Sequence, residues 1–241
     1  LVALIAAVNM IFSYIGQKKR GSIPETGKFY EWKHGKIFYQ KRGKGDPVLL
    51  IHGFEPSHSS KNLDALSKYL SDKHTVYSID LLGFGFSDKP WVTYTNFLYV
   101  QLIQDFVKNV IGEITDVVAY GGSALTALQA YNYDPTCLGK IVLIEPSRQE
   151  SIKAAKPFVK KLKNVLDFPM FGTFLYNLYS LTSAAPLDKD GRHVFASRLA
   201  GHLTTDISRR PDLLTQEVIV FGDPAKESAL FTYGDIGKAL I

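Results

Sequence analysis

One serine stands where a strand could turn sharply into a helix. Residues 115–120 form a short apolar run typical of buried parallel strands, and Gly121, Gly122 and Ser123 follow directly. The next residues, up to Tyr133, are mostly small or apolar and suit a helix. At such a turn a side chain is lifted off the sheet, and backbone N–H groups at the helix start lie beside it. This arrangement suits a nucleophile that attacks a carbonyl, with the N–H groups holding the oxyanion.

Two alignments of this turn are open. So tight a turn needs small residues two positions before and two positions after the nucleophile. With Ser123 as nucleophile, Gly121 is small but Leu125 is not. With Gly121 at the nucleophile position, both Ala119 and Ser123 are small, but that position has no side chain to attack with.

Two further segments accompany the turn. His52 and Gly53 end the apolar run that begins at Val48, and the segment DLLGFGFSDKP follows another apolar run from Asp80 onward. In this order and spacing the three segments resemble the α/β-hydrolase superfamily, and the resemblance covers about residues 29–224. It implies an α/β fold, with a mainly parallel sheet, helices on both faces and a helical cap over the site.

The resemblance also implies roles for individual residues. The nucleophile is expected at Ser123, or at the position of Gly121 in the other alignment. The oxyanion is expected to bind the N–H groups of Phe54 and Ala124, while His52 and Gly53 are expected to shape the site.

The acid that orients a catalytic histidine is expected at Asp223, with Glu145 as the alternative. The catalytic histidine itself is expected after one more strand, beyond Ile241. Since the chain also begins at Leu1 and not at Met, we expect it to be truncated at both ends.

These residues predict a hydrolase of the serine esterase or lipase type in the full-length protein. The expected substrate is a small or lipid-like molecule with an ester or acyl bond. The alternative is a non-catalytic relative that binds a ligand or a partner at the same place. A dehalogenase or epoxide hydrolase would need a carboxylate nucleophile, which neither Gly121 nor Ser123 supplies.

The N-terminal segment predicts attachment to a membrane. Residues 1–16 carry no charge and are mostly apolar, and Lys18, Lys19 and Arg20 follow. We expect a transmembrane or signal-anchor helix over residues 1–16, which would make this a single-pass protein of the cell membrane. The basic cluster favours the cytoplasmic side for the domain.

The pattern of apolar and polar residues divides the rest of the chain into four expected segments. We expect a linker over residues 17–28, the first part of the hydrolase core over 29–147, a helical cap over 148–210 and the second part of the core over 211–241. The expected parallel strands are Val48–Ile51, Val76–Ile79, Val117–Ala119, Ile141–Ile144 and Val218–Phe221.

Composition limits the other classes of function. The chain has 241 residues, 46% of them hydrophobic, which suits one globular domain with a sizeable core. The net charge of +5 is spread along the chain, so we expect no nucleic-acid partner. Cys137 is the one cysteine, which excludes an internal disulfide. Neither a dinucleotide fingerprint nor a P-loop is present, and we expect no cofactor and no metal.

Overall fold

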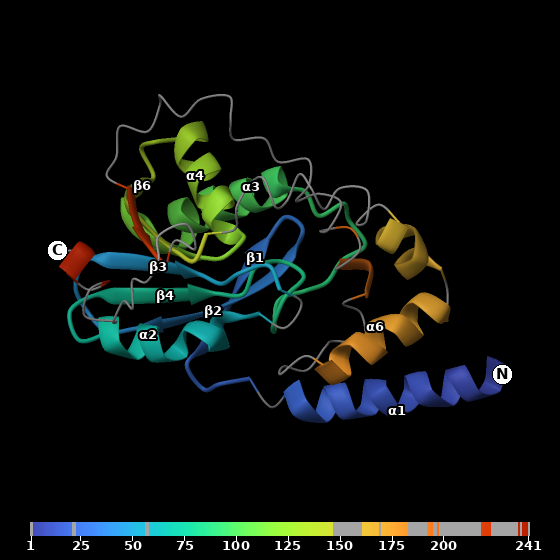
Figure 1. The fold of residues 1–241 in the computed structure, drawn as a ribbon. Coiled ribbons are helices and arrows are strands. Elements are labelled where there is room, and N and C mark those ends of the chain that lie inside the picture. Colours follow the sequence, from blue (N-terminus) through green and yellow to red (C-terminus); the bar gives the residue numbers. More distant parts are fainter. Residues whose placement is uncertain are drawn as a thin grey trace.

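A computed structural model of the chain shows a twisted sheet between two layers of helices (Figure 1). The structure describes residues 2–20, 23–55, 58–146, 161–168, 170–182, 192–194, 197, 218–222, 236 and 238–240. The strands are β1 (Gly27–Trp32), β2 (Gly35–Arg42), β3 (Pro47–Ile51), β4 (Thr75–Ile79), β5 (Thr115–Tyr120), β6 (Leu138–Ile144) and β7 (Val218–Phe221). The α-helices named below are α1 (Val2–Arg20), α2 (Asp64–Leu70), α3 (Asn96–Phe106), α4 (Ser123–Tyr133) and α6 (Phe171–Thr182).

The sheet has seven described strands in the order β1-β2-β4-β3-β5-β6-β7. β1 and β2 form an antiparallel hairpin, and β2 also pairs antiparallel with β4. From β4 through β7 every pairing is parallel. The five predicted parallel strands are therefore confirmed. Because the carboxyl ends of parallel strands meet at one edge of the sheet, the loops after β3, β5, β6 and β7 are brought together there.

Successive side chains along each strand point to opposite faces of the sheet, so the hydrophobic core has two parts, one on each face. Leu49, Ile51, Val117 and Ala119 face the layer of α3 and α4. Val48, Leu50 and Val118 face the other way, toward α2 and the short C-terminal helical segment that carries Ile236. All five β3 residues are buried, as expected for a strand covered on both faces.

The helix α3 shows how local sequence sets the boundaries of an element. Thr95 begins it, because the Thr95 side chain accepts a hydrogen bond from the Leu98 N–H at 3.2 Å. The helix continues as a π-helical turn, Val107–Ile111, and ends at Gly112, whose φ of 82° is left-handed. Glycine adopts this conformation without the steric cost that a Cβ would add.

The N-terminal helix is longer than expected and is not isolated. It extends to Arg20, so residues 17–20, predicted as linker, belong to α1. Figure 1 shows α1 beside α6, away from the sheet. The two helices are linked through Asn9, whose side chain donates to the Met170 carbonyl at 3.2 Å and accepts from the Asn177 amide at 3.0 Å. Among the described helices, none combines the length and apolar character that crossing a bilayer requires.

Candidate active site

Gly121 occupies the apex of the turn between β5 and α4. Its φ is 59°, in the left-handed region, and its N–H donates to the Ile144 carbonyl at 2.8 Å. Its carbonyl accepts from the Ala124 N–H at 3.2 Å, which closes the turn. A Cβ placed on Gly121 would have a single described neighbour within 4 Å, the Cα of Gly53 at 3.9 Å. The turn therefore has the geometry of a nucleophile elbow, with space where the nucleophile's side chain would be.

Ser123 lies two residues past this apex, as the first residue of α4, and is fully buried. Its hydroxyl is 2.8 Å from the Tyr120 carbonyl and 3.2 Å from the Ile51 carbonyl, so it donates to backbone acceptors. These contacts join the start of α4 to the ends of β5 and β3. Of the two alignments of the turn, the structure adopts the one with Gly121 at the apex. In this position the Ser123 hydroxyl faces buried backbone, and its role as nucleophile remains a prediction.

The backbone donors differ from the expected pair in one respect. The Ala124 N–H, expected to hold an oxyanion, is instead directed to the Gly121 carbonyl. With Gly121 at the apex, the amide that follows the nucleophile position belongs to Gly122, the N-cap of α4. Phe54 follows β3 on the neighbouring loop, where its ring packs on Tyr99 at 5.1 Å between centroids.

The loop that carries Phe54 is fixed by His52. The His52 ring is buried, and its Nε2 accepts from the Leu81 N–H at 3.1 Å. Nδ1 therefore carries the proton, and it donates to the Gly53 carbonyl at 2.7 Å. A Cβ on Gly53 would lie 2.6 Å from Nδ1 of His58, so a side chain there would displace the His58 ring.

Asp80 ties the glycine-rich loop after β4 to the 3₁₀-helical turn Ser60–Leu63, which lies between β3 and β4. Its buried carboxylate accepts the N–H groups of Ser60 at 2.6 Å and Phe86 at 2.8 Å. Burial raises the pKa of Asp80, and the hydrogen bonds from Ser60 and Phe86 oppose that rise. A Cβ on Gly85 would lie 1.9 Å from the Asp80 carboxylate, so the loop and the carboxylate fit only with glycine there.

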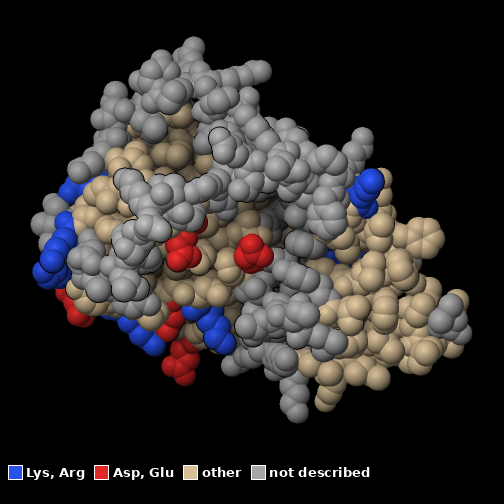
Figure 2. Space-filling model, viewed as in Figure 1, with Lys and Arg blue, Asp and Glu red and all other residues tan. Residues whose placement is uncertain are grey.

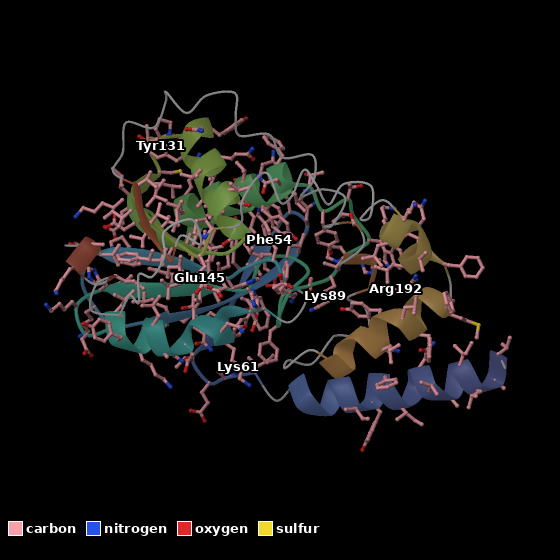
Figure 3. All side chains as sticks on the ribbon, in the orientation of Figure 1. Phe54, Lys61, Lys89, Tyr131, Glu145 and Arg192 are labelled. Atoms are coloured by element: carbon pink, nitrogen blue, oxygen red, sulfur yellow. The ribbon has the colours of Figure 1, made fainter. Side chains whose placement is uncertain are left out.

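Glu145, the alternative acid, follows β6 at the same edge of the sheet as Gly121. Its Oε2 accepts a hydrogen bond from the Tyr120 hydroxyl at 2.6 Å, and its N–H donates to the Phe221 carbonyl at 2.8 Å. The hydrogen bond to Glu145 and then burial raise the pKa of Tyr120 to about 12, so Tyr120 remains protonated and donates at neutral pH. Figure 3 labels Glu145 and Phe54 in the same central part of the view. The first-choice acid, Asp223, lies outside the described residues.

Two side chains near the turn were missed from the sequence. Tyr120 precedes Gly121, and the ring of His58 lies 5.6 Å from the Tyr120 ring, centroid to centroid. The position of Tyr120 at the end of a strand was a usable signal, whereas nothing local marks His58. Within the described ranges, no group of three or more His, Cys, Asp or Glu side chains is arranged to hold a metal ion.

Comparison with known proteins identifies the family to which this fold belongs. The model of the alpha/beta hydrolase family matches residues 48–234, which is more than half of the chain. The 2-hydroxy-6-oxo-6-(2'-aminophenyl)hexa-2,4-dienoic acid hydrolase of Metapseudomonas resinovorans is 37% identical over 71 residues, 29% of this chain and 24% of that protein. The mesoderm-specific transcript homolog protein of Bos taurus is 41% identical over 69 residues, 27% of this chain and 20% of that protein. The matched segments thus span about a quarter or less of these curated relatives.

Solved structures extend the likeness over most of the chain. An esterase from Exiguobacterium antarcticum superposes with a TM-score of 0.61, covering 88% of this chain and 86% of the esterase. At 15% identity this likeness shows the fold alone. Together with the family match, the parallel sheet and the β5–α4 turn, it leads to one conclusion. The chain belongs to the alpha/beta hydrolase family.

Proposed function

We propose that the protein is a hydrolase of small molecules in its full-length form. The observation that carries this proposal is the elbow itself: β5, the left-handed turn at Gly121 and the start of α4. The loops after β3 and β6 lie at the same edge of the sheet, where ligands of open α/β sheets bind. Membership of the family, and relatives that are named hydrolases, support the class of reaction.

The proposed substrate is an ester or another acyl compound, small or lipid-like. Such a substrate presents a carbonyl, and we propose that the N–H of Gly122, the N-cap of α4, stabilises negative charge on its oxygen. The lipid-like character rests on the sequence of α6, FGTFLYNLYSLT, which contains no charged residue, and it remains a prediction because α6 lies beside α1 and away from the sheet. The role of Asp223 as the acid remains a prediction within this proposal.

One observation favours a second function, non-covalent binding of the same kind of molecule. Gly121 has no side chain, and the hydroxyl of Ser123 is engaged by backbone carbonyls. Without a nucleophile at the apex, the site can hold a carbonyl compound in the elbow but cannot form an acyl-enzyme there. One experiment distinguishes the two functions.

The experiment is labelling of the full-length protein with a fluorophosphonate, alongside hydrolysis of p-nitrophenyl acetate, butyrate and octanoate. A serine hydrolase that uses Ser123 is labelled as wild type and not as Ser123→Ala. Ester turnover without labelling, unchanged in Ser123→Ala, keeps the hydrolase proposal but removes Ser123 from the mechanism. Binding of the esters with neither labelling nor turnover supports the non-catalytic function and contradicts the hydrolase.

We also propose that α1 and α6 attach the protein to a membrane surface. Leu4, Ile11 and Ile15 recur at spacings of seven and four residues, so they share one side of α1, and all three are exposed. Phe171 and Leu178, seven residues apart on α6, are exposed as well. Figure 2 shows that the end of the molecule formed by these helices is mostly without charged side chains on the face in view.

The proposed surface is the anionic cytoplasmic leaflet. An apolar helix side next to a basic cluster is typical of helices that lie in the interface, and Lys18, Lys19 and Arg20 form the last turn of α1. Co-flotation of the full-length protein with phosphatidylcholine vesicles, with and without 30% phosphatidylserine, tests this. We expect Ile11→Gln to reduce flotation, while Phe97→Gln, which changes an exposed side chain on α3, leaves it unchanged. Equal flotation of all three proteins, or none from any, contradicts the proposal.

A further inference from the structure

The pair Tyr120–Glu145 bridges two neighbouring strands at the edge where the Gly121 turn lies. Tyr120 is the last residue of β5, and Glu145 directly follows β6. Their 2.6 Å hydrogen bond fixes one carboxylate oxygen, while the side chain as a whole remains exposed. Tyr120 thus holds an accessible carboxylate in a defined orientation.

The backbone of Glu145 supports a role beyond packing. Its φ of 47° lies in the left-handed region, which side chains with a Cβ adopt at a cost. The surrounding structure keeps it there, because its N–H is bonded to the Phe221 carbonyl on β7. Such conformations concentrate at ligand sites, where the strain serves to direct a side chain.

The backbone that carries Glu145 is also next to the apex, because the Gly121 N–H donates to the carbonyl of Ile144, the residue before Glu145, at 2.8 Å. The Tyr120 ring lies 3.1 Å from the point where a Cβ of Gly53 would be. The Cα of Gly53, in turn, is the described atom nearest to a Cβ on Gly121, at 3.9 Å. The turn at Gly121 is therefore flanked by Gly53, by Tyr120 and, through Ile144, by the backbone that carries Glu145.

The charge of Glu145 lacks a described counter-ion. The described ion pairs of the molecule involve other carboxylates, those of Glu31, Asp64, Asp105 and Asp167. Tyr120 donates a hydrogen bond but brings no charge. A cationic group of a ligand is the chemistry that complements a fixed, exposed carboxylate of this kind.

We propose that Glu145, oriented by Tyr120, binds the ammonium group of a small-molecule ligand held at the Gly121 turn. This inference rests on the proposed function, since it requires a small molecule at the turn. It adds a class of ligand, a protonated amine, and it gives Glu145 a binding role different from that of an acid that orients a histidine.

The test compares two probes of the same length, protonated hexylamine and 1-hexanol, by NMR titration of the full-length protein. We expect the amine to bind about 2- to 5-fold more tightly than the alcohol, the range of partly exposed ion pairs. Glu145→Gln should remove this preference without changing the affinity for hexanol, and Tyr120→Phe should reduce it. Glu31→Gln, which removes an exposed carboxylate on β1 at the far end of the sheet, should leave it intact.

The outcomes separate this inference from the proposed function. Equal affinity for the two probes, or a preference that persists in Glu145→Gln, overturns the role of Glu145 while a small molecule still binds at the turn. If neither probe shifts the resonances of the turn, both the inference and the binding of small molecules there are refuted. Loss of the preference in Glu31→Gln as well would show a general effect of net charge and would also overturn the inference.

Discussion

Replacement of Gly121 by alanine measures how much room the apex of the turn has. The substitution adds a Cβ at a φ of 59°, and a left-handed backbone costs an L-residue about 1–2 kcal/mol. No steric term is added, because the nearest described atom to that Cβ is 3.9 Å away, an ordinary van der Waals distance. We therefore expect Gly121→Ala to lower the free energy of unfolding by about 1–2 kcal/mol.

The matched control is Gly85→Ala, at a second left-handed glycine. Its φ of 45° imposes a similar backbone strain, but its Cβ would lie 1.9 Å from the buried Asp80 carboxylate. Relief of this clash displaces a carboxylate that accepts the N–H groups of Ser60 and Phe86. Hydrogen bonds to a charged group are worth about 1.5–3 kcal/mol each, so we expect a total loss of about 3 kcal/mol or more.

Urea unfolding followed by circular dichroism gives both values from one set of experiments. The prediction is an order, with wild type most stable, Gly121→Ala second and Gly85→Ala clearly third. Similar losses for the two variants would refute the reasoning, because they would mean that the apex is as crowded as the Asp80 loop.

Three further predictions concern the hydrogen bonds of Tyr120, Asp80 and Asn9. Because the folded state raises the Tyr120 pKa from 10.0 to about 12, its hydrogen bond stabilises the fold below pH 10 and is lost as the pH rises toward 12. The absorbance at 295 nm that wild type shows and Tyr120→Phe lacks reports ionisation of Tyr120, and its midpoint should lie near pH 12. In a Glu145→Gln background this midpoint should move toward pH 10. A midpoint near pH 10 in both backgrounds contradicts the contact. Asp80→Asn deprives one backbone N–H of its acceptor and should lower stability by about 1.5–3 kcal/mol in urea, so a loss below about 0.5 kcal/mol argues against it. Asn9→Ala removes the hydrogen bonds of Asn9 to Met170, just before α6, and to Asn177 on α6, and should speed hydrogen exchange in α1; unchanged exchange would mean that other contacts hold the helix.

The sheet could be predicted because its strands carry their own signal. Val48–Ile51 is apolar at every position, which is typical of a strand buried on both faces, and all four residues have no exposed surface. The turn at His34 and Gly35 separated two alternating runs, and they pair as the hairpin of β1 and β2. These elements are set by local pattern, so reading along the chain was sufficient.

The site could be predicted only in part, because its geometry depends on which of two residues, Gly121 or Ser123, lies at the apex of the turn. The sequence allowed either Ser123 or Gly121 at the apex, and small residues alone could not decide between them. Tertiary contacts do decide: the Gly121 N–H reaches Ile144 on β6, and the Ser123 hydroxyl reaches Ile51 on β3. Both partners are distant in sequence, and no local pattern encodes them.

The pair of Tyr120 and Glu145 was out of reach for a similar reason. The two residues lie 25 positions apart and meet because β5 and β6 pair in parallel, with Tyr120 opposite Ile144. The association of α1 with α6 could not be predicted either, because Asn9 and Asn177 are 168 positions apart in the sequence. The uncharged segment at the N-terminus predicted a helix, but its packing partner could not be read from it.

The central claim is that Gly121, and not Ser123, faces the site from the apex of the turn. Alkylation by iodoacetamide of Gly121→Cys and Ser123→Cys, each in a Cys137→Ser background, measures this directly, with rates followed by mass spectrometry. The account predicts that the thiol at position 121 reacts about tenfold faster or more, because position 123 is fully buried and reacts only through local opening. Equal rates, or faster reaction at position 123, would contradict it.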